Sequence, residues 1–128
     1  MRWRKLGCIY APDGHEPWAR SHAMIPTPVQ MPDGGLRVYF ASCDDKGIGR
    51  IGYADLDPRD PTRILRRAAK PVLDIGRPGC FDDNGVNPTC AIWRGRSCVR
   101  WSTRSTRRRA SACSTAATCS MSSGCARA

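Results

Sequence analysis

The chain has 128 residues, of which 41% are hydrophobic and 25% charged, and its formal net charge is +10. These averages are typical of a globular domain, and no stretch approaches the ~20 apolar residues of a membrane-spanning helix. The basic N-terminus precedes too few apolar residues for a signal peptide, because Pro12 interrupts them, so we expect a cytoplasmic protein.

The strand signals begin at residues 23–30, an extended segment whose two prolines fit a strand end, an edge or a bulge. A turn signal at 32–35 leads into 36–42, a run rich in β-branched and aromatic residues. A second turn at 44–47 then leads into 49–56, which alternates like a strand. The order predicts antiparallel strands joined by tight turns.

The chain continues in shorter pieces after the proline-rich break at 57–61. Residues 62–69 fit either one helical turn or an outer strand, and residues 71–74 predict a short strand. Because no amphipathic helix longer than about two turns is evident, we predict an all-β fold. The GxGxxG pattern at 47–52 precedes a segment that cannot start a helix, so it indicates a hairpin and not a dinucleotide site.

One short motif occurs twice. Residues 22–29 and 84–92 share an apolar-x-Pro-Thr core, and the two Pro-Thr pairs are 62 residues apart. Three or four strand candidates lie between them. A repeated unit of about four antiparallel strands, each opening with a similar strand, is typical of a β-propeller blade.

The positive charge belongs almost wholly to the C-terminal tail. Residues 1–93 contain 13 Lys and Arg against 11 Asp and Glu, whereas residues 94–128 contain 8 Arg and no acid. Of those 35 tail residues, 30 are Arg, Ser, Ala, Thr or Cys, unlike an ordinary disordered tail. We therefore predict that the reading frame changes between Trp93 and Trp101, and that 94–128 is a non-native or disordered segment. A genuine basic tail and a fusion scar are the alternatives.

Reading the gene in all three frames beyond codon 93 tests this prediction. We expect another frame to continue with alternating strand patterns and acidic residues. A prompt stop codon in every other frame would contradict a frameshift.

The eight cysteines do not form a metal-binding motif. Cys8, Cys43, Cys80 and Cys90 are far apart in the first segment, and Cys98, Cys113, Cys119 and Cys125 lie in the tail. Structural zinc sites need two closely spaced ligand pairs, which neither group supplies. We expect free thiols and no metal.

Several polar residues are candidates for a site. His22 opens the first repeat, where it is either a hydrogen-bonded strand-end residue or a substrate contact. Asp82 and Asp83 precede the second repeat strand, where they form either an Asx-type turn or part of a ligand site. Adjacent acids in a strand point to opposite faces, so only one of them would enter a given site. Glycosidic chemistry needs two carboxylates flanking the scissile bond.

The arginine run at 107–109 raises nucleic-acid binding as an alternative, although Trp101 is the only aromatic residue nearby for base stacking.

A set of motifs resembles a known superfamily. They are Trp3-x-Lys5-Leu6-Gly7-x-Ile9-Tyr10, Trp18-x-x-Ser21-His22-Ala23-x-x-Pro26, Asp33-Gly34-x-Leu36-Arg37-Val38-Tyr39-Phe40, Arg50-Ile51-Gly52-Tyr53, Asp55-Leu56-Asp57-Pro58, Pro71-Val72-Leu73 and Gly79-x-Phe81-Asp82-Asp83-x-Gly85-Val86-x-Pro88. Together they resemble the N-terminal part of predicted glycosyl hydrolases of the five-bladed β-propeller superfamily, which includes arabinanases, levansucrases and invertases. The match covers about residues 3–93 and does not extend into the tail.

The resemblance implies a funnel-shaped site at the propeller axis that acts on a saccharide without a cofactor. It makes Asp83 and Asp82 the candidate catalytic residues. The candidate substrate-binding residues are His22, Arg37, Trp18 and Asn84.

This sequence departs from the superfamily pattern, because Ser21-His22-Ala23 stands where a catalytic Asp is expected in the first blade. A five-bladed propeller is also far longer than this chain. We therefore expect residues 1–93 to form the first blade and the start of the second, and the chain to be inactive alone. A non-catalytic carbohydrate-binding propeller and a small basic nucleic-acid binder are the alternatives.

Overall fold

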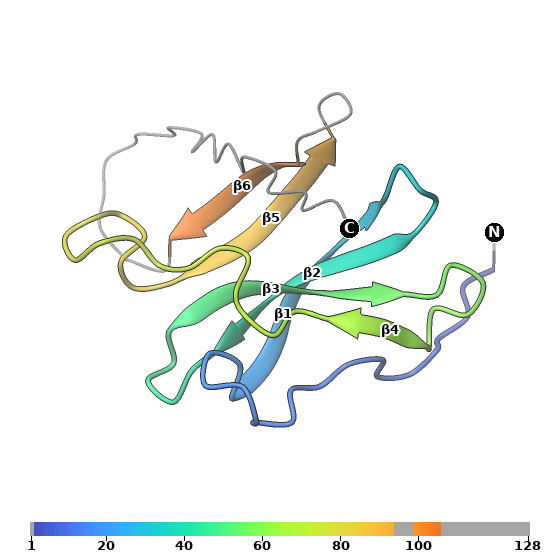
Figure 1. Ribbon diagram of the computed structural model, residues 1–128, viewed down its shortest axis with the longest axis horizontal. Helices are drawn as coiled ribbons and strands as arrows, with labels where there is room; N and C mark the ends of the chain where they lie inside the picture. The colour runs from blue at the N-terminus through green and yellow to red at the C-terminus, as the bar shows by residue number, and fades with distance from the viewer. Residues whose placement is uncertain (1, 94–98, 106–128) are drawn as a thin grey trace, which may run out of the picture.

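The computed structural model describes residues 2–93 and 99–105, which form strands and turns and contain no helix (Figure 1). The strands are β1 (Ser21–Gln30), β2 (Leu36–Cys43), β3 (Gly49–Leu56), β4 (Ile64–Arg67), β5 (Val86–Trp93) and β6 (Val99–Ser105). This secondary structure confirms the predicted all-β class. Within these ranges, no helix has the length and apolar character needed to cross a membrane.

The first four strands form one antiparallel sheet in the order β1-β2-β3-β4, and β5 pairs with β6 in a second sheet. Tight turns produce the simple up-and-down order. In the β1–β2 turn, the Met31 amide donates to the Gly35 carbonyl over 2.8 Å, and Gly34 has a φ of 85° that favours glycine. The glycines of the GxGxxG pattern fall in the β2–β3 turn and in β3, as the hairpin interpretation predicted.

The two proline-containing repeat strands both have irregular pairing. The register of β1 shifts on either side of Met24, and that of β5 shifts between Pro88 and Cys90. Proline has no amide hydrogen for the ladder, and a bulge beside Pro26 or Pro88 interrupts the regular pairing where that donor is missing.

One face of the four-stranded sheet is covered by the segment that precedes β1. Trp18 and Ala19 pack there against Phe40, and the ring of Tyr10 lies 4.7 Å from that of Phe40 between centroids. The indole Nε1 of Trp18 donates to the Ala69 carbonyl over 3.1 Å. The N-terminal segment is thereby joined to the chain that leaves β4.

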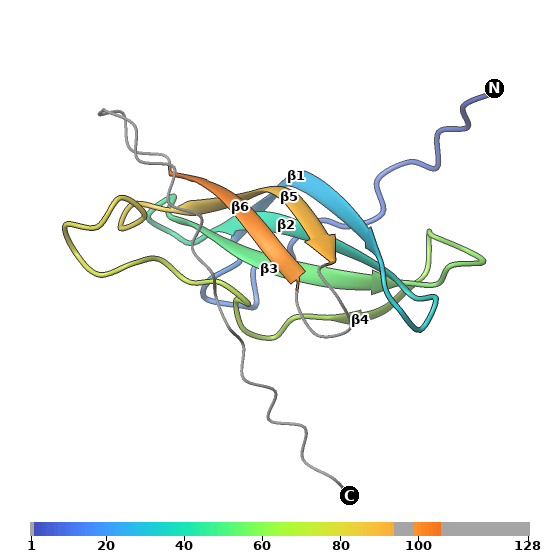
Figure 2. The same ribbon diagram turned by 90° about the horizontal axis from the view of Figure 1, so that it is seen from above.

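The opposite face of the sheet is covered by the second sheet. Val29, Tyr39 and Ile51 form a buried cluster there with Val86 of β5. Figure 2 shows the β5–β6 pair lying over this face, and Figure 1 shows β5 running in the same general direction as β1. The two sheets therefore pack face to face, and the start of β5 is fixed by burial of Val86.

The structure shows the outcome for the two short segments predicted after β3, residues 62–69 and 71–74. Residues 64–67 pair with β3, so the outer-strand interpretation of 62–69 is confirmed over β4. The short strand predicted at 71–74 is wrong, because only Leu73 forms a bridge, with Ile51. After this bridge, Asp74 contacts β3 through its side chain, whose carboxylate accepts hydrogen bonds from Arg50 and from the amide of Ile75.

Residues 99–105 belong to the predicted tail, yet they pair antiparallel with β5 as β6. The rest of that tail, including its four cysteines, lies outside the described residues, and the frameshift stays a prediction. The four cysteines of the first segment are free thiols, and of these only Cys43 is buried.

Candidate functional site

Most of the predicted site residues lie where several strands of the four-stranded sheet begin or end. We call this end of the strands the starting edge. β1 and β3 begin there and β2 ends there, since Ser21 pairs with Cys43 and Cys43 with Gly49. β5 begins at the same edge, because the Val86 carbonyl lies 3.5 Å from the position that a Cβ would take on Gly49. The first strands of both sheets therefore start side by side.

His22 lies at the first positions of β1 with an exposed side chain. Its Nδ1 is 2.8 Å from the Ser21 hydroxyl, and its carbonyl accepts a 2.8 Å hydrogen bond from the buried Ser42 hydroxyl. Its φ of 64° is unusual for a residue other than glycine. The backbone of His22 is thus fixed by β2, and the imidazole is presented to solvent at the starting edge.

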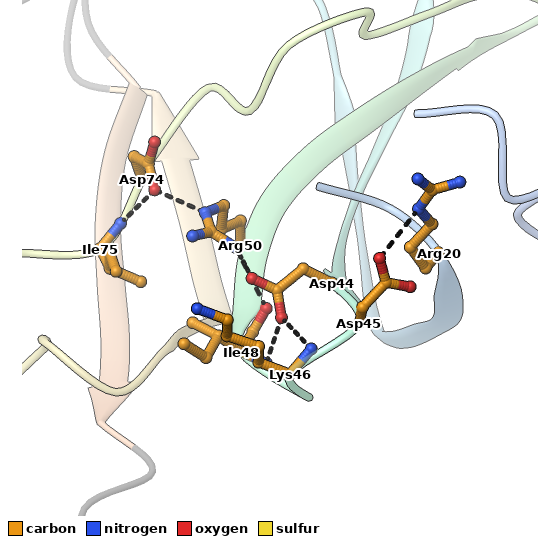
Figure 3. A network of polar contacts seen from close by, with 8 residues as sticks. All are labelled: Arg20, Asp44, Asp45, Lys46, Ile48, Arg50, Asp74 and Ile75. Carbon is orange, nitrogen blue, oxygen red and sulfur yellow. Dashed lines mark hydrogen bonds and ion pairs between the residues drawn. The ribbon is translucent and has the colours of Figure 1, made fainter. Parts of the chain in front are cut away.

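A network of ion pairs crosses the starting edge (Figure 3). Arg50 at the beginning of β3 binds Asp44 at 2.7 Å through one terminal nitrogen and Asp74 at 2.6 Å through Nε. A weaker pair joins Arg20 and Asp45 at 3.5 Å. The network ties the β2–β3 turn to the segment that leads towards β5.

Asp44 also organises the β2–β3 turn. Its Oδ1 accepts hydrogen bonds from the amides of Lys46 and Ile48, each over 2.9 Å. Burial alone would raise the pKa of Asp44, but the hydrogen bonds from Arg50 and from these two amides outweigh it and hold the pKa below its ordinary value. Asp44 is therefore ionised at neutral pH and serves the structure, and a role as a general acid does not suit it.

Asp82 and Asp83 lie in a turn that precedes β5, and not within the strand. The Asp83 carboxylate accepts the Gly79 amide over 2.7 Å, and the Asp82 carbonyl accepts the amides of Gly76 and Gly85. The rule of opposite strand faces does not apply to a turn, so both acids can face the same side. The two acids lie in a turn, as one of the two sequence interpretations predicted, but the turn is not of the Asx type, because the Asp83 carboxylate accepts an amide four residues earlier in the chain and not one two residues later.

The turn that carries the two acids belongs to the starting edge. At one end of the segment, Asp74 binds Arg50, and at the other end, Val86 lies beside Gly49. Figure 1 shows the segment, in yellow-green, projecting beyond the sheets at this edge. It carries the exposed side chains of Phe81 and Asn84.

Sequence reasoning missed Asn87, the second residue of β5. Its Oδ1 is buried, has no hydrogen-bond partner among the described residues, and lies 3.6 Å from the position of a Cβ on Gly49. The signal was its place in the second repeat strand, one residue before Pro88.

Arg37 and Trp18 lie apart from this group. Arg37 pairs with Asp55 and is six residues along β2 from Cys43, so it lies about 20 Å from the starting edge. Its Nε and one of its terminal nitrogens donate to the two oxygens of the Asp55 carboxylate, at 2.6 and 3.0 Å. Trp18 is only 8% exposed and packs beneath the sheet. These contacts give both side chains a structural role, and their substrate contacts stay predictions.

The starting edge therefore combines His22, Asp82, Asp83 and Asn84, and leaves out Arg37 and Trp18. An imidazole, carboxylates and an amide can exchange hydrogen bonds with hydroxyl groups of a ligand. Within residues 2–93 and 99–105, no group of three or more His, Cys, Asp or Glu side chains is arranged to hold a metal ion.

The chain is similar to two curated proteins of Mycobacterium tuberculosis, uncharacterized protein MT1551 of strain CDC 1551 / Oshkosh and uncharacterized protein Rv1502 of strain ATCC 25618 / H37Rv. Each is 41% identical over 87 residues, which is 68% of this chain and 29% of the relative. The chain thus spans less than a third of the length of these relatives. No protein-family model matches it. No solved structure matches it either.

Proposed function

We propose that residues 1–93 form the first blade and the start of the second blade of a five-bladed propeller related to glycoside hydrolases. The parent protein would act on the glycosidic bonds of a saccharide, and this chain would be inactive alone. The observation that carries the proposal is the sheet arrangement. A four-stranded up-and-down sheet is followed by β5, which runs in the direction of β1 and packs Val86 on the sheet face.

The starting edge supports the same proposal. In a propeller the first strands of the blades line the central funnel, and here β1 and β5 begin at one edge with His22 and Asp83 near their starts. Carboxylates from other blades would then complete the pair that glycoside hydrolysis needs. The 29% coverage of the mycobacterial relatives is compatible with such additional blades.

One observation favours a second function, which is saccharide binding without hydrolysis. The backbone at the beginning of β1 carries Ser21, His22 and Ala23, and none of them is a carboxylic acid. An imidazole and a hydroxyl can hold a sugar hydroxyl group, but they do not replace a carboxylate nucleophile in the usual glycosidase mechanism.

Assays of this chain and of the full-length relative Rv1502 test the proposal. We expect no turnover of aryl glycosides by this chain, because only part of a funnel is present. We expect the full-length relative to hydrolyse at least one aryl glycoside. Asp83 in this chain and the corresponding residue in the relative are the matched sites for substitution.

The possible outcomes separate the two functions. Saccharide binding by the relative without hydrolysis favours the non-catalytic function. Enzyme-like turnover by this chain alone contradicts its predicted inactivity, and a relative that neither binds nor hydrolyses any saccharide contradicts the proposal as a whole.

A further inference from the structure

A strongly basic surface lies at the side of the molecule formed by β4 and the N-terminal segment, and we call it the outer-edge surface. Its basic residues are Arg2, Arg4, Lys5, Arg59, Arg63, Arg66, Arg67 and Lys70. All eight side chains are exposed. They are eight of the 13 basic residues in residues 1–93, a segment whose net charge is only +2. Most of the basic residues in 2–93 therefore belong to β4, to the connections on either side of it and to the N-terminal segment.

Contacts show that the two parts of this surface lie together. Arg67 of β4 binds Asp13 of the N-terminal segment at 2.7 Å. The pKa of Asp60 lies below its ordinary value, because Thr62 donates hydrogen bonds to the carboxylate and because Arg63 and Arg4 are close to it. Figure 1 shows the N-terminal segment, in violet-blue, running along the side of the sheet that carries β4.

Most of these cations are not neutralised within the described chain. Arg66 binds Asp55 and Arg67 binds Asp13, whereas the other six basic residues form no salt bridge with any residue in 2–93. Asp57 and Asp60 are the acids of the β3–β4 connection. The surface therefore keeps a net positive charge that attracts anions.

The shape of the surface suits a long ligand better than a single small anion. Arg63, Arg66, Arg67 and Lys70 lie in β4 and beside its two ends, so Arg63 and Lys70 can be up to about 25 Å apart. Arg66 binds Asp55 and Arg67 binds Asp13 of the N-terminal segment, so these cations line both sides of the β4 edge. No enclosed anion pocket is required for such a row. A linear polyanion can contact several members at once and release counterions from each contact.

The position of β4 in the fold keeps this surface accessible. β4 is the last strand in the order of its sheet, and the two sheet faces carry the apolar clusters. Further sheets of a longer protein would pack on a face, so they would leave the outer edge in solvent.

We propose that the outer-edge surface binds an acidic polysaccharide, an inference that rests on the proposed function and gives its substrate class. Uronate carboxylates along a glycan would contact the exposed arginines. A nucleic acid is a poorer match, because β4 offers no aromatic side chain for base stacking, and Trp3 is the one exposed aromatic residue of this surface.

Two triple variants of the full chain test the inference by binding to polygalacturonate. The outer-edge variant carries Arg59→Glu, Arg63→Glu and Lys70→Glu, and the matched variant carries Arg107→Glu, Arg108→Glu and Arg109→Glu. Both change the charge equally, and thermal unfolding checks that each is folded. We expect about a tenfold weaker affinity for the outer-edge variant and less than a twofold change for the matched variant.

A neutral galactan and a single-stranded oligonucleotide of equal charge complete the experiment. The inference is overturned if both variants weaken polygalacturonate binding equally, since the effect would then be one of net charge. It is also overturned if the oligonucleotide binds the outer edge as tightly as the polysaccharide. If the outer edge binds polygalacturonate selectively but full-length Rv1502 acts on no saccharide, the proposed function fails and the binding surface stands.

Discussion

Replacing Gly52 with alanine is expected to destabilise the chain by about 2–3 kcal/mol, as overpacking of a buried contact does. A Cβ at this position would lie 2.2 Å from Cη2 of Trp18 and 2.9 Å from its Cζ3. The indole cannot move aside cheaply, because it is 8% exposed and its Nε1 binds the Ala69 carbonyl. Urea denaturation followed by circular dichroism measures the change in the free energy of unfolding.

Gly49→Ala provides the matched control, since it makes the same change in the same strand. A Cβ on Gly49 would meet its nearest neighbours at 3.5 and 3.6 Å, which is ordinary contact, and its φ is not in the left-handed region. We expect it to be neutral or slightly stabilising. When Trp18 is also replaced by leucine, Gly52→Ala should lower the free energy of unfolding much less than it does in the native background. Equal losses for the two glycine variants would show that the indole contact does not control stability.

Replacing Asp55 with alanine is expected to destabilise the chain by about 2–3 kcal/mol, because it leaves a half-buried cation without its partner. The Asp55 carboxylate joins three strands, binding Arg37 at 2.6 Å and Arg66 at 2.9 Å. The Arg37 and Asp55 side chains are 17% and 19% exposed. The Arg37 guanidinium also lies 4.0 Å from the centre of the Tyr53 ring.

The same carboxylate gives the stability of the chain a dependence on pH. Burial would raise the pKa of Asp55, but hydrogen bonds and charge from Arg37 and Arg66 outweigh it, so its folded pKa lies below the ordinary value of 3.8. A lowered folded pKa means that the stabilisation is complete above the unfolded pKa and is lost as the pH falls through the folded pKa. At pH values below about 4 we therefore expect the free energy of unfolding of the native chain to decrease as the pH decreases. The decrease should be less steep in Asp55→Asn.

Asp45→Ala is the control for this prediction. Asp45 also pairs with an arginine, but its side chain is 77% exposed and the distance is 3.5 Å. We expect a change within about 0.5 kcal/mol and an unaltered dependence on pH. If Asp45→Ala and Asp55→Ala cost the same, the half-buried position of Asp55 has no special effect.

The strand pattern of the first 56 residues was predictable because it rests on local signals. The turn residues at 32–35 and 44–47 and the apolar runs between them fix where the chain reverses, and β2 and β3 formed there. The segment at 71–74 was mispredicted because its apolar run resembles a strand. Whether it pairs depends on how much of the β3 edge lies beside it, which only the tertiary structure decides.

The candidate site was predictable only in part, and for a similar reason. The repeat placed His22 and Asp83 near the starts of two strands, and the packing of β5 on the sheet brings those starts to one edge. Arg37 was grouped with them by resemblance, but antiparallel pairing puts it at the other end of β2. The buried amide of Asn87 had no sequence signal beyond its place in the repeat.

The sequence by itself determined the all-β class, the order of the early strands and the separation of a charge-balanced segment from an arginine-rich tail. These depend on alternation, turn residues and composition, which act over a few residues. The tertiary structure decided which arginines are held by carboxylates and which remain exposed along β4, and that Trp18 is a core residue resting on Gly52. Those outcomes depend on strand register and sheet packing, which bring together residues that are distant in the chain.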